Sequence, residues 1–260
     1  MRVIVTRLEC EARRWVGELA ARGFDAHALP LIVIAPAADA QPLRAAWQQL
    51  AGYQAVMFVS GAAVAHFFMA NQPDVFEQWA HGAIKTRAWS PGPGTAAALR
   101  QAGLATAGID SPDAAAGQFD SEALWQVVQS QVQPGCRVLI VRGGDARGQG
   151  AGRDWLARQL GAAGATVDGV VAYARQAPQF SPSQLALARQ AASDGSVWLF
   201  SSSEAIAHLV QQLPAQCWGD ARAVVTHPRI GEAARAAGFG VVCESRPTLD
   251  DVVASIESAR

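Results

Sequence analysis

The side chains best suited to hold an anionic ligand gather where predicted strands give way to predicted helices. Two of these junctions are rich in serine, Ser60-Gly61 and Ser201-Ser202-Ser203-Glu204, and a third is Pro91-Gly92-Pro93-Gly94-Thr95. Backbone N–H groups at the start of a helix attract anions, and glycine lets a ligand approach them closely. Capping of each helix by its own hydroxyl group is the simpler alternative. Because the pattern recurs, we expect some of these junctions to bind one shared ligand.

Arginines stand at or just past the ends of several predicted strands, and Arg7, Arg142 and Arg229 occupy corresponding places. A guanidinium group binds a carboxylate through two parallel hydrogen bonds, so several arginines that line one cleft would recognise a polyanion. A single arginine, in contrast, is usually a solvated surface residue. A glycine-rich stretch adds Arg147 and Arg153, and a surface loop explains that stretch equally well.

Histidine and tyrosine supply the candidates for proton transfer. His227 stands at a strand-to-helix junction and is a binding candidate, whereas His66 and His208 fall among alanine and valine and are expected to be structural. Of the two tyrosines, Tyr53 precedes an apolar strand and is expected to pack in a core. Tyr173 lies in an extended run, from which its hydroxyl group can reach a ligand cleft.

The common signatures of cofactor sites and activated nucleophiles are missing from the sequence. It has no GxxxxGK[ST] phosphate loop, no GxSxG elbow and no HExxH zinc motif. The cysteines are too widely spaced for a zinc site or a disulfide framework, and we expect small buried or half-buried thiols at Cys10, Cys136, Cys217 and Cys243. The sequence therefore predicts a site made of ordinary side chains and backbone, with no cofactor and no metal.

These junctions belong to a repeat, because the second half of the chain matches the first in three units. Residues 58–66 and 200–208 agree at five of nine positions, and the other matched pairs are 2–7 with 137–142 and 87–95 with 222–230. Each unit is a β-rich run, then serine, threonine, glycine or proline, then an alanine-rich stretch. Glycines close four of these stretches, at Gly23, Gly103, Gly164 and Gly238.

An alternation of strands and helices predicts parallel sheets with crossover helices. Two doubly wound α/β domains are the economical fold, and their junctions would all lie at the carboxyl ends of strands, where such sheets bind ligands. Proline-framed extended runs near 30–36 and 167–176 are the expected connectors of a hinge. A tandem division near Gly135 is the competing partition, and periodicity alone does not choose between them.

The overall composition excludes several classes of protein. The 260 residues are 50% hydrophobic, which suffices for packed cores, and a formal net charge of −1 argues against a broad basic face for nucleic acid. The chain starts directly with a strand pattern, without the features of a signal peptide, and no apolar run approaches the roughly 20 residues needed to span a bilayer. We therefore expect a cytoplasmic protein that binds neither nucleic acid nor membrane.

Taken in order, these segments resemble the uroporphyrinogen-III synthase family along nearly the whole chain. The matching features are Val5-Thr6-Arg7, Phe58-Val59-Ser60, Gly92-Pro93-Gly94-Thr95, residues 138–143, Tyr173, residues 200–204 and His227-Pro228-Arg229-Ile230. The resemblance implies two α/β domains joined by a two-stranded β ladder. It favours residues 1–35 with 176–260 as one discontinuous domain and 37–172 as the other, with the first unit of each repeat exchanged.

The resemblance also implies a substrate and a reaction. The substrate would be hydroxymethylbilane, a flexible chain of four pyrroles with eight carboxylates, and the enzyme would be a lyase that needs no cofactor. Loss of the substrate's hydroxyl as water gives an azafulvene, and attack by the substituted carbon of the last pyrrole gives a spiro intermediate that rearranges to the inverted ring. Without an enzyme, ring closure leaves that pyrrole uninverted. A transient contact with hydroxymethylbilane synthase is a further expectation, and a monomer is the expected state.

The family resemblance suggests Tyr173 as the general acid. The candidates for gripping carboxylates are Thr6, Arg7, Ser60, Gly61, Gly92, Gly94, Thr95, Arg142, Gly143, Ser202, Ser203, His227 and Arg229. Two departures from the family pattern bear on this set, because Val59 replaces a common hydroxyl residue and Arg229-Ile230 replaces a threonine pair. The rival functions are a two-lobed binding protein for a small anion, a catalytically inactive relative, and a nucleotide-dependent enzyme.

Overall fold

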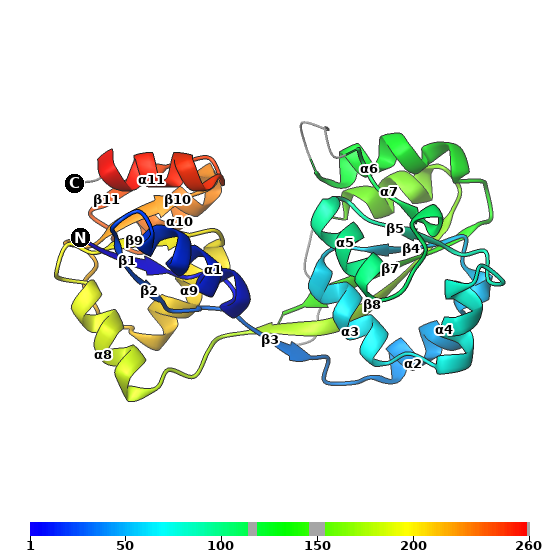
Figure 1. Ribbon diagram of the computed structural model, residues 1–260, viewed down its shortest axis with the longest axis horizontal. Coiled ribbons are helices and arrows are strands. Elements are labelled where there is room, and N and C mark those ends of the chain that lie inside the picture. The colour runs from blue at the N-terminus through cyan, green and yellow to red at the C-terminus, as the bar shows by residue number, and fades with distance from the viewer. Residues whose placement is uncertain (114–118, 146–153, 259–260) are drawn as a thin grey trace. The chain divides into compact units, whose positions relative to one another are not determined.

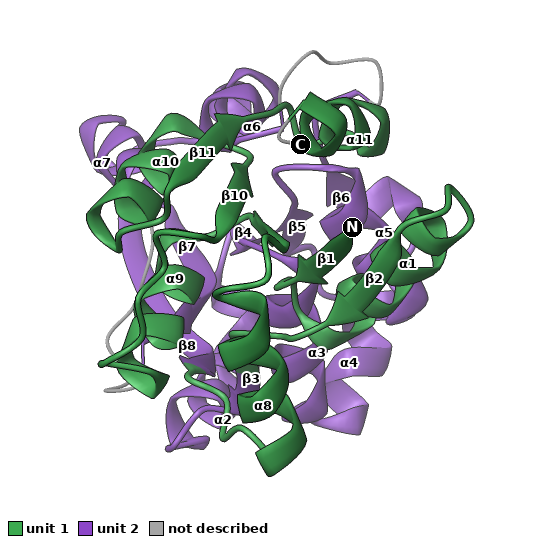
Figure 2. Cartoon of the chain, turned by 90° about the vertical axis from the view of Figure 1, so that its left-hand side faces the viewer, with its two compact units in different colours: residues 1–33, 176–260 green, residues 34–175 purple. Residues whose placement is uncertain are grey.

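The structure, a computed structural model, describes residues 1–113, 119–145 and 154–258. The chain divides into two compact units (Figures 1 and 2). Unit 1 comprises Met1–Val33 with Gln176–Arg260, and unit 2 comprises Ile34–Arg175. The chain therefore leaves unit 1, builds unit 2 and returns.

Unit 1 is a parallel sheet covered by helices on both faces. Its strand order is β11-β10-β9-β1-β2. The strands are β1 (Arg2–Val5), β2 (Asp25–Ala28), β9 (Val197–Phe200), β10 (Arg222–Val225) and β11 (Val241–Glu244). The helices are α1 (Glu9–Ala20), α8 (Pro182–Ala191), α9 (Ser203–Gln212), α10 (Pro228–Ala236) and α11 (Leu249–Ser258).

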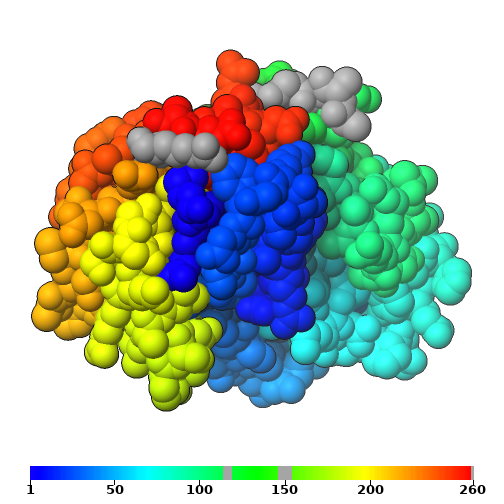
Figure 3. Space-filling view, turned by 60° about the vertical axis from the view of Figure 1, so that its left-hand side comes forward, coloured from blue at the N-terminus to red at the C-terminus, as the bar shows by residue number. Residues whose placement is uncertain are grey.

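Alternation along the strands divides the core of unit 1 into two layers. Val3 and Val5 pack with Leu199 against α1 and α11. Trp198, one position along, faces the other side, where its indole Nε1 donates to the Ala191 carbonyl of α8 at 3.1 Å. The first and last helices thus share one layer, and the blue and red segments lie together in Figure 3.

Unit 2 has the same doubly wound design. Its strand order is β3-β8-β7-β4-β5-β6. The strands are β3 (Val33–Pro36), β4 (Ala55–Phe58), β5 (Arg87–Trp89), β6 (Ile109–Asp110), β7 (Arg137–Gly144) and β8 (Thr166–Gln176). Helices α2 (Gln41–Gln48), α3 (Gly61–Met69), α4 (Pro73–Ala80) and α5 (Pro93–Gln101) contribute to one core layer, and α6 (Ser121–Val128) and α7 (Trp155–Ala162) to the other. Short 3-10 turns, η1 (Leu50–Gly52), η2 (Thr106–Gly108) and η3 (Gln129–Gln131), complete the unit.

The repeat seen in the sequence is a repeat of strand pairing. In unit 1, β1 and β10 flank β9, with Val3 and Arg222 both opposite Val197. In unit 2, β7 and β5 flank β4 in the matching register, with Val138 and Arg87 both opposite Ala55. Strand β1 therefore lies beside β9, from the second half of the chain, and β7 lies beside β4, from the first. The predicted α/β class with two parallel-dominated sheets is confirmed.

Glycine closes the helices where the sequence predicted it. Gly23, Gly103, Gly164 and Gly238 all have φ between 83° and 103°. A side chain disfavours this left-handed backbone, which explains why glycine stands at these helix ends.

Three expectations from the sequence need correction. Cys10 and Cys217 are exposed rather than buried, although Cys136 and Cys243 are half-buried as predicted. Arg142 lies within its strand rather than at or just past the end, because β7 continues to Gly144. Arg229 lies in the first turn of α10 and is exposed.

Candidate functional site

In each unit the direction of strand addition reverses beside the candidate residues. The chain adds β5 and β6 on one side of β4 and adds β7 and β8 on the other. In unit 1 the same reversal falls between β1 and β9. Open α/β sheets bind ligands at the carboxyl ends of strands at such a reversal. Ser60 follows β4 and Gly143 lies near the end of β7, so the candidates of unit 2 flank this position.

Ser60 has two partners at the start of α3. Its Oγ accepts the N–H of Ala63 at 3.2 Å, which is an N-terminal cap. The same Oγ lies 3.2 Å from the hydroxyl oxygen of Tyr173, and either atom can donate in this pair. Gly61 follows in the first helical turn and packs against Ala98 of α5. The predicted capping role is thus confirmed for Ser60, and a contact with Tyr173 is added to it.

Tyr173 is held within unit 2 with only 5% of its surface exposed. It lies on β8, close to Gly143 of the neighbouring strand β7. The imidazole of His66 on α3 lies 5.7 Å from the phenol ring, centroid to centroid, at an interplanar angle of 33°. Burial lowers the pKa of His66 from its usual 6.5, which favours the neutral ring. Tyr53, as predicted, packs in the core of the same unit.

In the glycine loop before α5, fewer backbone N–H groups are free to bind an anion than the sequence suggested. The N–H of Gly92 donates to Ser90 Oγ at 3.3 Å, and Ser90 Oγ donates to the Gly92 carbonyl at 2.7 Å. The amides of Gly94 and Thr95 lie in the first helical turn, where N–H groups have no partner within the helix. Gly94 is exposed and the Thr95 side chain is buried. An anion would therefore meet the two amides of the first turn.

Arg142 is already paired in this structure. Its Nη1 lies 3.0 Å from an oxygen of Asp154, which is 64% exposed. Its guanidinium group also lies over Gly169, where an added Cβ would come within 3.1 Å of Nη2. Since an exposed ion pair contributes little stability, the carboxylate of a ligand can compete with Asp154 for this arginine.

In unit 1, the hydroxyl of Thr6 is used inside the protein. It donates to the Leu199 carbonyl at 2.6 Å, and the residue is 3% exposed. Its predicted role in binding would therefore need this hydrogen bond to break. Arg7 pairs with Glu11 at 3.1 Å, and its guanidinium carbon lies 4.3 Å from the centroid of the Trp15 ring.

The remaining candidates of unit 1 follow β9 and β10, which are adjacent strands. Ser202 precedes α9 and makes no capping bond with its side chain, so capping does not account for this hydroxyl. Ser203 begins the helix. His227 caps α10, because its Nδ1 accepts the N–H of Arg229 at 3.1 Å. His227 and Arg229 are both exposed.

In unit 2, Ser60, Gly61, Gly92, Gly94, Thr95, Gly143 and Tyr173 lie at or near the carboxyl ends of their strands. Arg142 lies on the other face of the sheet from Tyr173, because side chains of β7 alternate between the two layers and its partner Asp154 directly precedes α7. In unit 1, Thr6, Arg7, Ser202, Ser203, His227 and Arg229 follow the carboxyl ends of β1, β9 and β10. Arg147 and Arg153 lie outside the described residues. Sequence reasoning missed Asp154 as the partner of Arg142 and undervalued His66 as a neighbour of Tyr173. Nothing in the sequence around Asp154 indicates that it pairs with Arg142. The position of His66 on the helix that begins after Ser60 was predictable, but its contact with Tyr173 on β8 depends on tertiary packing.

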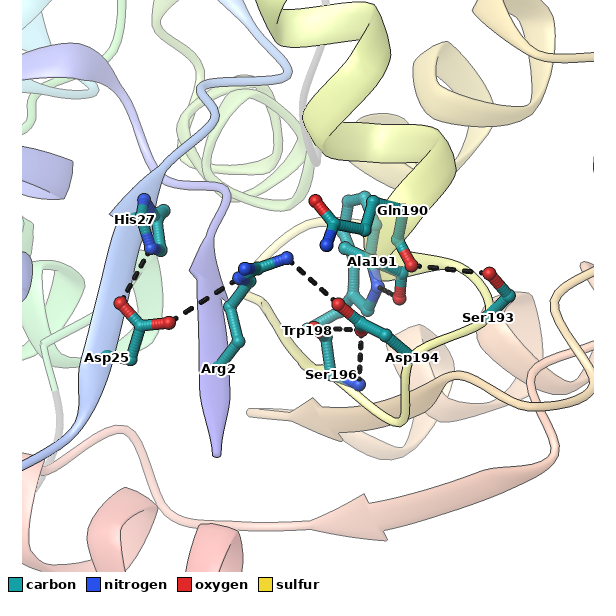
Figure 4. Close-up of polar contacts among 9 residues, drawn as sticks. All are labelled: Arg2, Asp25, His27, Gln190, Ala191, Ser193, Asp194, Ser196 and Trp198. Atoms are coloured by element: carbon teal, nitrogen blue, oxygen red, sulfur yellow. Dashed lines mark hydrogen bonds and ion pairs between the residues drawn. The ribbon is translucent and has the colours of Figure 1, made fainter.

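At the amino ends of the strands, ion pairs connect neighbouring parts of each sheet and stabilise the fold. In unit 1, Arg2 lies 2.9 Å from Asp194 and 3.5 Å from Asp25, and His27 lies 2.8 Å from Asp25 (Figure 4). The hydrogen bond from His27, together with its charge and that of Arg2, lowers the pKa of Asp25. These contacts tie strand starts together, at the edge opposite the candidate junctions.

The amino edge of unit 2 repeats this arrangement. Arg137 lies 2.6 Å from Asp168 and 4.6 Å above the centroid of the Tyr53 ring. A pocket of about 270 Å³ near the start of β5 is lined in part by Lys85 and by Arg87, which pairs with Asp110. Within the described residues, no cluster of histidine, cysteine and carboxylate could hold a metal ion, and no helix is long and apolar enough to cross a membrane.

Two doubly wound units, each with candidate residues at its strand-to-helix junctions, define a two-domain α/β protein. The chain belongs to the uroporphyrinogen-III synthase HemD family, whose family model matches residues 13–254. Membership makes the chain an enzyme of haem biosynthesis. The resemblance stated from the sequence is thereby confirmed.

Two solved structures show the same fold. Uroporphyrinogen-III synthetase from Helicobacter pylori is 16% identical over 100% of both chains, with a TM-score of 0.61. A mutant uroporphyrinogen III synthase from Thermus thermophilus is 15% identical, with a TM-score of 0.55, over 100% of this chain and 98% of that one. At such identities the likeness carries the fold alone, and the family match carries the function in tetrapyrrole biosynthesis. Neither comparison favours a small-anion binding protein.

Proposed function

We propose that the chain is a hydro-lyase that cyclises hydroxymethylbilane to uroporphyrinogen III, with loss of water and inversion of the last pyrrole ring. The observation that carries the proposal is the Tyr173–Ser60 pair, which lies where the sheet of unit 2 reverses. A proton donor at this place suits a reaction that begins with departure of a hydroxyl group. Family membership supplies the substrate class.

Tyr173 is the proposed general acid. Ser60 Oγ accepts the Ala63 N–H and can donate its own proton to the phenol oxygen. The phenol proton is then available to the departing hydroxyl, which leaves as water. The resulting azafulvene is attacked by the substituted carbon of the last pyrrole, and the spiro intermediate rearranges. Ring closure releases one proton, which restores the phenol, so the step needs no oxidant or reductant.

The rest of the proposed site orients a flexible polyacid. In unit 2, the first-turn amides of α3 and α5 and the guanidinium of Arg142 can bind carboxylates. In unit 1, Arg7 and the starts of α9 and α10 offer the same chemistry. Holding the reacting carbons in place lowers the barrier by roughly 7–11 kcal/mol in well-oriented intramolecular reactions. Selection of the inverted isomer is then a matter of how the substrate is folded.

Three finer proposals accompany this function. Free hydroxymethylbilane cyclises spontaneously to the uninverted isomer, so direct transfer between enzymes would avoid this loss. We therefore propose a transient contact with hydroxymethylbilane synthase. We also propose that the chain acts as a monomer in the cytoplasm.

The test is turnover of hydroxymethylbilane by the purified chain and by Tyr173→Phe. We expect the wild type to form the type III isomer and Tyr173→Phe to lower kcat by about 100-fold, the lower end for loss of a general acid, with little change in KM. Tyr53→Phe is the matched control, because that phenol lies at the Arg137 ion pair. An unchanged kcat in Tyr173→Phe would remove Tyr173 as the acid.

A further inference from the structure

Strand β8 carries an irregularity next to Tyr173. Arg142 of β7 pairs with Val171, but the next residue, Gly143, pairs with Tyr173, so Ala172 is an extra residue in β8. Side chains of a regular strand alternate between the two faces of the sheet. Here Val170, Ala172 and Tyr173 all belong to one core layer. The bulge therefore turns Tyr173 to the face covered by α3, in the way that bulges re-aim side chains.

Gly143 makes room for the phenol that the bulge has turned. A Cβ on Gly143 would lie 2.5 Å from Cζ of Tyr173, 2.6 Å from Cε2 and 2.8 Å from the hydroxyl oxygen. Gly143 is not among the glycines with positive φ, so its backbone conformation does not itself require glycine. The requirement is one of space. A larger residue would displace the Tyr173 ring.

Helix α3 supplies the other contacts of the phenol. Ser60, at its start, lies 3.2 Å from the hydroxyl oxygen, and the half-buried ring of His66, two turns on, lies 5.7 Å from the phenol ring, centroid to centroid. A ring at this separation and tilt restricts the directions in which the phenol can turn. The hydroxyl and the ring of Tyr173 are thus both fixed by α3.

We propose that Gly143 and His66 are positioning residues for Tyr173, which act with the bulge at Ala172 to keep the phenol hydroxyl at Ser60. Gly143 binds no carboxylate in this account, although the sequence suggested that role. The catalytic consequence rests on the proposed function, but the placement of the ring does not. The two are therefore tested by different measurements.

The placement is tested by fluorine NMR, because the chain has only two tyrosines. Protein labelled with 3-fluorotyrosine gives one signal from Tyr53 and one from Tyr173, assigned with Tyr53→Phe. Gly143→Ala should move or broaden the Tyr173 signal and leave that of Tyr53 in place. Gly161→Ala is the matched control in the same unit, since a Cβ there meets no atom within 4 Å. A Tyr173 signal that Gly143→Ala does not move would overturn the proposal.

The kinetic test asks whether Gly143 acts through Tyr173. Gly143→Ala should lower kcat about 10-fold or more with KM within about twofold, and should change kcat less than about twofold when Tyr173→Phe is already present. Equal losses in the two backgrounds would contradict a positioning role. Absence of the type III isomer with the wild type would instead refute the proposed function, whatever the NMR spectra show.

His66 gives a second route in case Gly143→Ala does not fold. His66→Ala should shift the Tyr173 fluorine signal and lower kcat severalfold. His66→Phe keeps a flat ring at this half-buried position and should restore most of the signal position and the rate. If His66→Phe is no better than His66→Ala, or if neither moves the signal, the ring contact does not position Tyr173.

Discussion

Ser60→Ala removes two stabilising interactions at once, because the Ser60 hydroxyl both caps α3 and contacts the Tyr173 hydroxyl. The substitution removes the N-terminal cap of α3, which is worth about 1 kcal/mol. It also removes the partner of the buried Tyr173 hydroxyl, and a hydrogen bond of this kind contributes about 1 kcal/mol. We therefore expect Ser60→Ala to lower the free energy of unfolding of unit 2 by about 2 kcal/mol in total.

A double-mutant cycle with Tyr173→Phe divides this total. Once the phenol hydroxyl is gone, Ser60→Ala should cost only the cap, about 1 kcal/mol, so the coupling energy between the two positions is about 1 kcal/mol. The assay is urea unfolding followed by circular dichroism. Ser181→Ala is the control, because Ser181 caps α8 in unit 1 through an equivalent bond to Gln184 and has no tyrosine partner.

The outcome of this cycle decides whether the Ser60–Tyr173 hydrogen bond is formed in solution. Ser181→Ala should shift the urea unfolding transition of unit 1 and leave that of unit 2 unchanged, which assigns each transition to its unit. A coupling energy below about 0.3 kcal/mol, the usual error of additivity, would mean that the two side chains are independent. In that event the proposed donation from Ser60 to the phenol would have to be abandoned.

Two other predictions concern charged groups. Arg142→Ala should raise KM severalfold and change kcat little, because the guanidinium is proposed to bind the substrate equally in the ground state and the transition state. Steady-state kinetics test this, and an unaltered KM would exclude Arg142 from the site. The lowered pKa of Asp25 implies stability that is present above pH 3.8 and lost as the pH falls through the folded-state pKa. Asp25→Asn should therefore lose less stability than the wild type below pH 3.8 in acid unfolding, and identical losses would contradict the role of the His27–Asp25–Arg2 contacts.

Local sequence patterns predicted much of the fold. The matched units predicted the strand-to-helix junctions, and closing glycines such as Gly23 and Gly164 predicted the helix ends, because both depend on backbone preferences of short segments. The repeat did not by itself reveal that β1 and β7 are exchanged between the units. That arrangement depends on which edges pair, and the pairing partners lie far apart in the chain.

The position of the candidate residues at strand-to-helix junctions was predictable, but their contacts were not. Thr6 was assigned to ligand binding from its position after β1, yet its hydroxyl bonds to Leu199, 193 residues away. Arg142 was expected at or just past the end of its strand, yet β7 continues beyond it and its guanidinium group pairs with Asp154. The bulge at Ala172 was also invisible, because a register shift is set by the partner strand. Tertiary contacts of this kind leave no local pattern.

We propose that this chain directs inversion of the last pyrrole as the ring closes. The most direct test incubates freshly prepared hydroxymethylbilane with purified protein that has been exhaustively dialysed, oxidises the products to porphyrins and separates the isomers by chromatography. We predict an excess of the type III isomer that grows with protein concentration. Only the uninverted isomer, formed at the rate seen without protein, would contradict the claim.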